Sequence, residues 1–165
     1  MDFVEIIENL FGGGAGIALL GGVLAAASGG VGSTYGVSKV GKVAMGVITE
    51  EPSLFGKVLI LQALPSTNGI YGLLVWFMVM FQGGFLDGTY GEMSYVTGVI
   101  IFISCIPSIL ALYPGSVKQA EVSSAGAQMM LKRPENQAQA LVLTAMIETY
   151  AILALLIAVL GILYA

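Results

Sequence analysis

Histidine is absent from the 165 residues of the chain, and Cys105 is its only cysteine. A single cysteine excludes a disulfide within the chain and leaves no cysteine-based metal site to consider. Charged residues make up 10% of the chain and hydrophobic residues 57%, whereas ordinary soluble domains carry roughly a quarter charged residues. Because so few charges cannot cover a solvated surface, the composition predicts a membrane protein. Cys105 is then expected to be a small apolar residue buried in a helix.

Apolar windows of about 20 residues, enough to cross a bilayer core, occur at 10–37, 58–81, 95–117 and 138–165. They leave no room for a soluble catalytic domain. The glycine run of the first window lacks the GK[ST] ending of a phosphate-binding loop. The opening residues, MDFVEIIENL, are acidic and contain no lysine or arginine, so a cleavable signal peptide is not expected.

Basic residues are few and unevenly placed. Five of the six flank two short connections, ITEEPS and KRPENQ: Lys39, Lys42, Lys57, Lys132 and Arg133. The positive-inside rule predicts that these connections, near 49–54 and 132–137, face the cytoplasm and that both termini face the other side. The sequence thus predicts an all-α multi-pass protein of the cell membrane with two tandem helical hairpins. The hairpins are 1–82 (helices about 11–48 and 54–82) and 94–165 (helices about 94–132 and 137–165), joined by an outer loop at 83–93.

The two hairpins are predicted to be copies of one another. When Pro52 is aligned with Pro134, VLILQALPSTNGI lies over ALVLTAMIETYAI with matching hydropathy. This agreement indicates an internal duplication. At the position of Glu148 in the second hairpin, the first hairpin has Ser66, so the chain keeps one acid where the ancestral pair is expected to have had two.

Glycine is concentrated in the first apolar segment, FGGGAGIALLGGVLAAASGGVGSTYG. Small residues let helix backbones approach closely in membranes. Such a run is typical either of tight packing within one bundle or of the inner wall of a ring of many copies. Its density favours the ring.

Four polar residues fall at one depth when distance is counted from the turn prolines. Glu148 lies roughly 14 residues, or roughly 21 Å of helix, beyond the second of these prolines. Gln119 precedes the same proline by about the same length of helix, and Thr67 and Asn68 follow the first proline by a similar length. Because these residues come from three helices that are otherwise largely apolar, we interpret them as one site.

Pro65 stands two residues before this polar pair. A proline inside a helix lacks an N–H and clashes with the preceding turn, so nearby carbonyls lose or weaken their bonds. The LPST stretch therefore either offers main-chain oxygen at the depth of Thr67 or is only a packing kink, and its polar neighbours favour the first. Pro107 and Pro114 have no such neighbours and are predicted to be kinks.

A bare carboxylate in hydrocarbon is costly, so Glu148 must be protonated, paired with a cation or directed into a polar cavity. Lys118 is the basic residue that could pair with it, although Lys118 can instead pair locally with Glu121 at i+3. What otherwise surrounds Glu148 is oxygen from hydroxyl, amide and carbonyl groups. One negative charge among such oxygens suits a small monovalent cation, whereas Mg²⁺ or Ca²⁺ normally draws more carboxylates.

Tyrosines also lie near this level. Tyr71 follows Thr67 by one helical turn, so its hydroxyl either donates to the Glu148 carboxylate or packs. Tyr150 lies within a turn of the same level. Aromatic residues around the outer loop are predicted to form an interfacial belt: Phe85, Tyr90 and Tyr95.

The segments LILQALPSTNGIYG, AGAQMMLKRPEN and MIETYAIL resemble the rotor-ring proteolipid (K, or c-type) subunit of V-type ATPases, above all its bacterial sodium-translocating members. The resemblance covers essentially the whole chain. It implies a Na⁺ site made of Glu148, the backbone oxygen of Leu64, the Thr67 hydroxyl and the amides of Asn68 and Gln119, with Tyr71 bonded to the carboxylate. One departure is Asn68, where the sodium-binding members carry glutamine. Asparagine is one methylene shorter, so its oxygen retreats by about 1.5 Å.

The resemblance also implies a mechanism and partners. Each of many identical subunits in a lipid-embedded ring would carry one ion on Glu148. A stator membrane subunit with an arginine would exchange that ion through aqueous half-channels. Central-stalk subunits on the cytoplasmic side would link the ring to a separate soluble head that hydrolyses ATP, and no nucleic acid is expected as a partner.

Three alternatives remain at this point. A proton-carrying rotor subunit needs only a protonatable carboxyl and one hydrogen-bond partner, and Thr67 and Gln119 exceed that need. A small four-helix exchanger of protons for organic cations predicts aromatic residues around Glu148, yet Trp76 and Phe77 lie more than a turn from LPST. A purely structural ring or pore protein leaves the polar cluster unexplained.

Overall fold

The structure is a computed structural model that describes residues 13–165. It consists of long helical segments: α2 (Gly14–Glu50), then η1 (Pro52–Leu54), α3 (Phe55–Ala63), η2 (Leu64–Ser66) and α4 (Thr67–Gln82), then α5 (Tyr95–Lys132), then η4 (Pro134–Asn136) and α6 (Gln137–Leu163). Four stretches, 14–50, 52–82, 95–132 and 134–163, are long and apolar enough to cross a membrane. The all-α membrane architecture predicted from the composition is confirmed over these residues. Positions 11 and 12 of the first expected helix lie outside the described residues.

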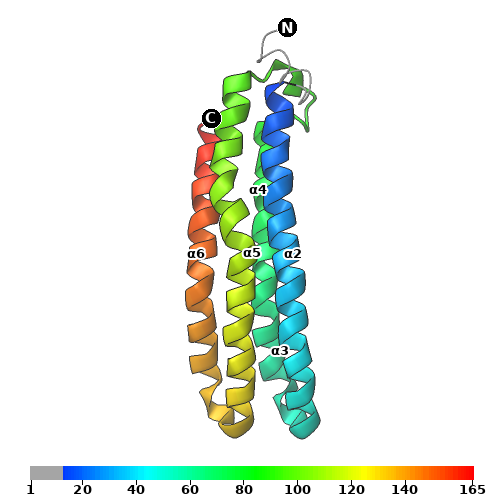
Figure 1. Cartoon of the computed structure of the whole chain (residues 1–165), viewed down its shortest axis with the longest axis vertical. Coiled ribbons are helices and arrows are strands. Elements are labelled where there is room, and N and C mark those ends of the chain that lie inside the picture. Colours follow the sequence, from blue (N-terminus) through cyan, green and yellow to red (C-terminus); the bar gives the residue numbers. More distant parts are fainter. Residues whose placement is uncertain (1–12) are drawn as a thin grey trace.

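The helices form an elongated bundle in which both short turns lie at one end (Figure 1). The C-terminus and the α4–α5 loop lie toward the other end. Inside the bundle α2 packs against α5 and α4, and α5 also packs against α6. The second segment is not one continuous helix, because η2 interrupts it at Pro65 between α3 and α4.

Close approach of helix backbones depends on glycine in α2. A Cβ atom on Gly32 would lie 2.8 Å from the Cα of Tyr113 in α5. A Cβ atom on Gly36 would lie 2.7 Å from the Cβ of Pro65. Both distances are shorter than van der Waals contact allows, so these positions require glycine for α2 to reach its neighbours.

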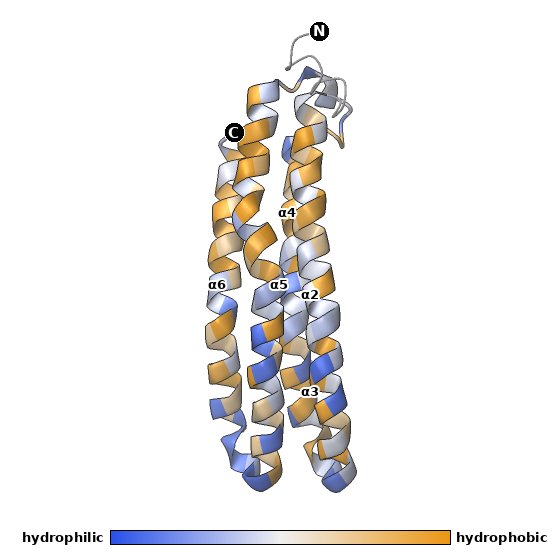
Figure 2. Cartoon of the chain, viewed as in Figure 1, coloured by the Kyte–Doolittle hydropathy of each residue, from blue (hydrophilic) through white to orange (hydrophobic). Residues whose placement is uncertain are grey.

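Two apolar clusters form the core, with polar side chains between them. One cluster, around Ile101 and Cys105, lies toward the C-terminal end of the bundle, and the other, around Leu61 and Met130, lies toward the turns. The expected burial of Cys105 is confirmed, since its exposed fraction is 0%. Hydrophobic residues fill most of the half away from the turns, and hydrophilic ones gather toward the turns (Figure 2).

A serine from α2 inserts into α5 beside one of its prolines. The Ser28 hydroxyl donates to the Ile109 carbonyl (2.7 Å) and accepts from the Tyr113 amide (3.2 Å). That carbonyl and that amide are four residues apart, the pair that an uninterrupted helix bonds to each other. Ser28 therefore stabilises the helical turn that precedes Pro114, a contact between two helices that the sequence did not indicate.

The α4–α5 loop is closed by its own contacts. Gly84 has φ +70°, a left-handed conformation suited to glycine, and its carbonyl accepts from the Tyr90 amide (3.1 Å). The rings of Phe85 and Tyr90 stack with centroids 5.4 Å apart. The Thr89 hydroxyl and amide both donate to Asp87, and these bonds hold the pKa of this exposed carboxyl below its usual value.

Candidate functional site

The Glu148 carboxylate of α6 receives hydrogen bonds from two other helices. The Tyr71 hydroxyl of α4 donates to its Oε1 atom (2.6 Å), and the Gln119 amide of α5 donates to its Oε2 atom (3.5 Å). Glu148 itself is half-buried. Both carboxylate oxygens are thus held by neutral donors, which offsets the cost of keeping a charge in an apolar surrounding.

The hydrogen-bond chain continues from Gln119 to Asn68. The Asn68 Nδ2 atom donates to the Gln119 Oε1 atom (3.1 Å). Both side chains are buried, with exposed fractions of 1% for Asn68 and 0% for Gln119. The Asn68 Oδ1 atom has no hydrogen-bond partner among the described residues. A buried acceptor without a donor is costly, so it marks a place where a ligand or a rearranged partner would be stabilising.

The LPST stretch supplies two oxygens at the same level. The Thr67 hydroxyl donates to the Leu64 carbonyl (2.8 Å), so these two oxygens lie side by side where η2 meets the start of α4. The neighbouring Pro65 carbonyl accepts from the Ser33 hydroxyl (2.8 Å) and the Ser116 hydroxyl (3.1 Å). The carbonyls around the proline therefore find hydroxyl partners in place of helix N–H groups.

Ser33 does for α4 what Ser28 does for α5. Besides donating to the Pro65 carbonyl, its hydroxyl accepts from the Gly69 amide (2.7 Å). This carbonyl and this amide are again four residues apart, so the serine completes an interrupted helical turn. Sequence reasoning missed Ser33 and Ser116. The available signal was the Gly-Ser pair that occurs at 32–33 in α2 and again at 115–116 in α5.

The alternative pairing of Lys118 with Glu148 was wrong. Lys118 forms an ion pair with Glu121 (3.1 Å), and Lys39 of α2 approaches the same carboxylate (3.5 Å). The i+3 spacing on one helix face brings Lys118 to its local partner at lower entropic cost than a partner on another helix. No lysine or arginine forms an ion pair with Glu148 within residues 13–165.

The arrangement suits a monovalent cation or a proton rather than a divalent metal. Within the described part of the chain, no three carboxylate, histidine or cysteine side chains come together as a metal site. Hydrogen bonds join the Glu148 carboxylate of α6 to the Gln119 amide of α5, and that amide to the Asn68 amide of α4. The Thr67 hydroxyl, one residue before Asn68, is bonded to the Leu64 carbonyl. Tyr150 lies on α6 near this level but is 72% exposed, and it takes no part in the cluster.

The chain is similar in sequence to known proteins over its whole length. The family model of the ATP synthase C-subunit matches the chain twice, over residues 13–79 and 102–161. The chain is 36% identical over 166 residues to the V-type sodium ATPase subunit K of Enterococcus hirae, an alignment that covers all of this chain and 99% of that protein. It is 31% identical over 144 residues to the A-type ATP synthase subunit K of Methanocaldococcus jannaschii, covering 87% of this chain and 60% of that protein.

Proposed function

Because the chain belongs to the ATP synthase C-subunit family, we propose that it is a rotor-ring subunit of a V-type ATPase that carries Na⁺ on Glu148. Identical copies form the ring, and the four apolar segments cross the membrane. The observation that carries the ion assignment is the surrounding of Glu148: neutral donors hold both carboxylate oxygens, and no basic side chain within residues 13–165 pairs with it. A mobile cation is the natural counter-charge. The relative named a sodium ATPase subunit supports Na⁺.

The oxygens available to Na⁺ come from three parts of the bundle. Leu64 and Thr67 present a carbonyl and a hydroxyl oxygen 2.8 Å apart, and Glu148 supplies the charge. Oxygen donors with a single carboxylate match the preference of a hard monovalent cation. Tyr71 keeps the carboxylate in one orientation, so the ligands are preorganised around the ion.

The two buried amides can change from donors into ligands. When Glu148 is bound only by hydrogen bonds, Gln119 presents its Nε2 atom to the carboxylate. If both amides turn over as Na⁺ binds, Gln119 presents Oε1 to the ion and donates Nε2 to Asn68 Oδ1, the oxygen without a partner among the described residues. The turn-over replaces the bond from Asn68 to Gln119 by a bond from Gln119 to Asn68, and the ion takes the place of the bond that Gln119 gave to Glu148, so the carboxylate keeps a partner.

The ring can turn through the lipid because each ion-loaded site is neutral. A Glu148–Na⁺ pair carries no net charge, so it can pass the lipid at far lower cost than the bare carboxylate. At a stator membrane subunit, an arginine would displace the ion into an aqueous half-channel. The hairpin turns near 49–54 and 132–137 would face the cytoplasm and contact central-stalk subunits, which couple the ring to ATP hydrolysis elsewhere in the complex.

The second candidate is a proton carried on the same carboxyl. The observation that favours it is the amide nitrogen of Gln119, not its oxygen, facing Glu148. A proton site needs the carboxyl and one partner, and Tyr71 already provides that partner. Of the other interpretations of the sequence, a small four-helix exchanger is not supported, because both halves of the chain match the rotor-subunit family.

Carbodiimide labelling of Glu148 tests the ion. The reagent attacks a protonated carboxyl, so bound Na⁺ should protect Glu148 at neutral pH in membranes containing the whole complex. Potassium at the same ionic strength should protect much less, and Glu148→Gln should abolish labelling at this position. If Na⁺ and K⁺ leave the labelling rate equally unchanged, the ion is the proton and the sodium proposal fails.

A further inference from the structure

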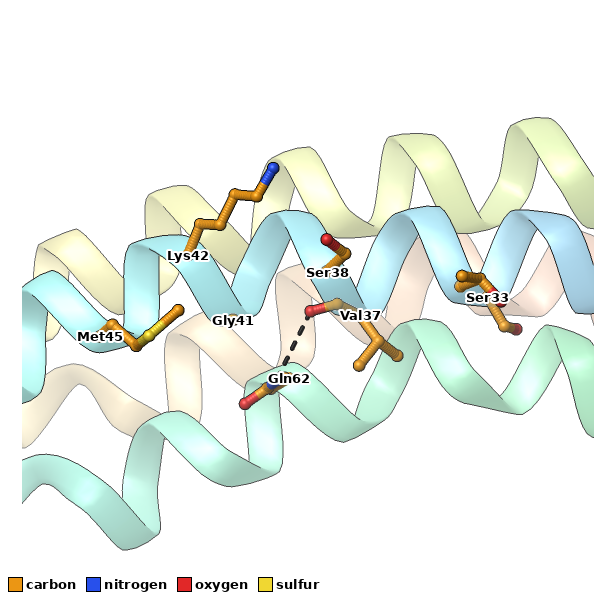
Figure 3. Close-up of a pocket in the computed structure, with 8 residues that line it drawn as sticks. Ser33, Val37, Ser38, Gly41, Lys42, Met45 and Gln62 are labelled. Atoms are coloured by element: carbon orange, nitrogen blue, oxygen red, sulfur yellow. Dashed lines mark hydrogen bonds between the residues drawn. The ribbon is translucent and has the colours of Figure 1, made fainter.

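The Pro65 carbonyl, one residue after the Leu64 carbonyl of the candidate site, is bonded by two other helices at once. Ser33 of α2 donates to it (2.8 Å), and Ser116 of α5 donates to it as well (3.1 Å). Both serines are buried, with exposed fractions of 9% and 0%. Ser33 lies at one end of an open groove between α2 and α3 (Figure 3). The two hydroxyls therefore tie the LPST stretch to α2 and α5 at a single point.

These bonds hold a helical turn in an unusual conformation. In a regular helix the Pro65 carbonyl would accept from the Gly69 amide, but this amide donates to the Ser33 hydroxyl instead (2.7 Å). The turn is thus opened by an inserted hydroxyl. Directly before it, η2 is a tight turn in which the Leu64 carbonyl accepts from the Thr67 amide. An opened turn beside a tight one is not what a helix adopts by itself, so the serines stabilise it.

The second hairpin, which supplies the acid, has neither part of this arrangement. When the two turn prolines are aligned, Ile147 stands at the position of Pro65 and Gly115 at that of Ser33. Accordingly, α6 runs unbroken over Gln137–Leu163. Within the chain, the proline and the inserted serine occur together in the hairpin that would lend a main-chain oxygen to the ion. This co-occurrence indicates that the opened turn belongs to the site and not to general packing.

One face of α5 contacts this region twice. Ser116 and Gln119 are three residues apart, so they lie on the same side of the helix. Ser116 bonds the Pro65 carbonyl, and Gln119 accepts from the Asn68 amide (3.1 Å). The same stretch of α5 therefore provides a candidate ligand and fixes the main chain from which the other ligands come.

We propose that Ser33 and Ser116 are positioning residues for the ion site and set its selectivity for Na⁺ over K⁺. The role rests on the proposed function, in which Glu148 carries Na⁺. By holding the Pro65 carbonyl, the serines fix how far the oxygens of the LPST stretch lie from the Glu148 carboxylate. K⁺ is the larger ion and needs longer bonds to oxygen, so ligands that cannot move apart bind it less well than Na⁺. Ligands held in place before the ion arrives also bind Na⁺ more tightly.

Ser116→Ala tests this role, with Ser108→Ala as the matched control. Ser108 also lies on α5, is also 0% exposed, and also donates to a carbonyl of another helix at 3.1 Å, that of Ala154. It lies about 12 Å along the helix from Ser116. Each variant therefore loses one buried bond of the same kind, and only one of the two bonds is next to the site.

The readout is the concentration of Na⁺ or K⁺ that half-protects Glu148 from carbodiimide, at constant ionic strength, in membranes containing the whole complex. In Ser116→Ala the Na⁺ concentration should rise about threefold to tenfold, whereas the K⁺ concentration should not rise. The ratio of the K⁺ value to the Na⁺ value should therefore fall by the same factor. Ser108→Ala should leave this ratio unchanged, because general weakening of the bundle would affect both ions equally.

Ser116→Cys provides a milder variant in case the alanine variant does not assemble. Cysteine has nearly the same size and keeps a weak donor, so the ratio should lie between those of wild type and Ser116→Ala. A wild-type ratio in both Ser116 variants, or an equal fall in Ser108→Ala, would overturn the proposal while Na⁺ protection of the wild-type protein still supports the proposed function. Absence of Na⁺ protection in the wild-type protein would instead reject the proposed function, and the role of the serines with it.

Discussion

Glu148 shows how a single carboxylate is tolerated among apolar helices. Its two oxygens are bonded by Tyr71 and Gln119, and Gln119 is in turn bonded by Asn68. Each donor is neutral, and the nearby Lys118 pairs with Glu121 of its own helix instead of with Glu148.

Thr67→Val separates the two candidate ions. Valine keeps the shape of threonine but removes the hydroxyl oxygen, and an interaction with a charged partner is worth about 1.5–3 kcal/mol. The Na⁺ concentration that half-protects Glu148 from carbodiimide should therefore rise about tenfold or more. If the site carries only protons, labelling should be unchanged.

Thr149→Val is the matched control for this substitution. Thr149 makes the same bond to the carbonyl three residues before it, yet it lies on the exposed face of α6. Sodium protection of Glu148 should be unaffected in this variant. An equal loss of protection in both variants would show that the effect reflects general weakening of the helix and not a lost ligand.

Among the helices, α2 contributes both close packing and hydrogen bonds to its two neighbours. Its glycines bring it close to α4 and α5, and its serines then reach into those two helices. Ser28 spans the turn before Pro114, and Ser33 spans the turn after Pro65. The prolines would otherwise leave main-chain groups without partners in a membrane, where such groups are especially costly.

Ser33→Ala should destabilise the site region. The Gly69 amide loses its hydroxyl partner, and a buried donor left unpaired costs about 1–3 kcal/mol. We expect a lower midpoint of thermal unfolding in detergent and weaker Na⁺ protection of Glu148, because Asn68 is the next residue to Gly69. Ser104→Ala is the control, since the Ser104 hydroxyl bonds only the Ile100 carbonyl of its own helix (2.8 Å) among the described residues. Equal effects of both variants would contradict the role of Ser33.

Across the whole molecule, the duplication produced two hairpins that are alike in sequence but unequal in surroundings. Near the site, the second hairpin is covered by the first. The first hairpin has an open groove between α2 and α3, and one face of α6 is exposed. Head-to-tail contacts between identical copies form a ring when the rotation from copy to copy closes, and the subunits of this family form such rings.

Tyr150→Ala should weaken that ring. Tyr150 is 72% exposed in a single copy, and the ring of the proposed function is expected to cover it. Removing a buried large aromatic side chain typically costs about 3–5 kcal/mol, and the loss recurs in every copy. The assembled ring should therefore dissociate at a lower temperature in detergent. Tyr164→Ala is the control, because Tyr164 is even more exposed (88%) but lies at the end of the chain. Rings that dissociate at the same temperature in both variants would contradict a buried Tyr150.

Much of this protein follows from its sequence alone. Hydropathy over windows of about 20 residues predicts the four membrane-crossing segments, because crossing depends on local composition and length. The duplication and the common depth of Glu148, Gln119, Thr67 and Asn68 follow from counting residues along helices of constant rise. None of these inferences requires knowing which way a helix is rotated about its axis.

The partners of each side chain were decided only by the tertiary structure. Rotation and spacing of the helices place Asn68 against Gln119, insert Ser33 beside Pro65, and leave Tyr150 on an open face. These outcomes depend on how closely two helices approach each other at the glycines of one of them. That distance is a property of the packed pair and not of either sequence segment. For the same reason, the open groove between α2 and α3 is a property of how these helices pack and not of either sequence segment.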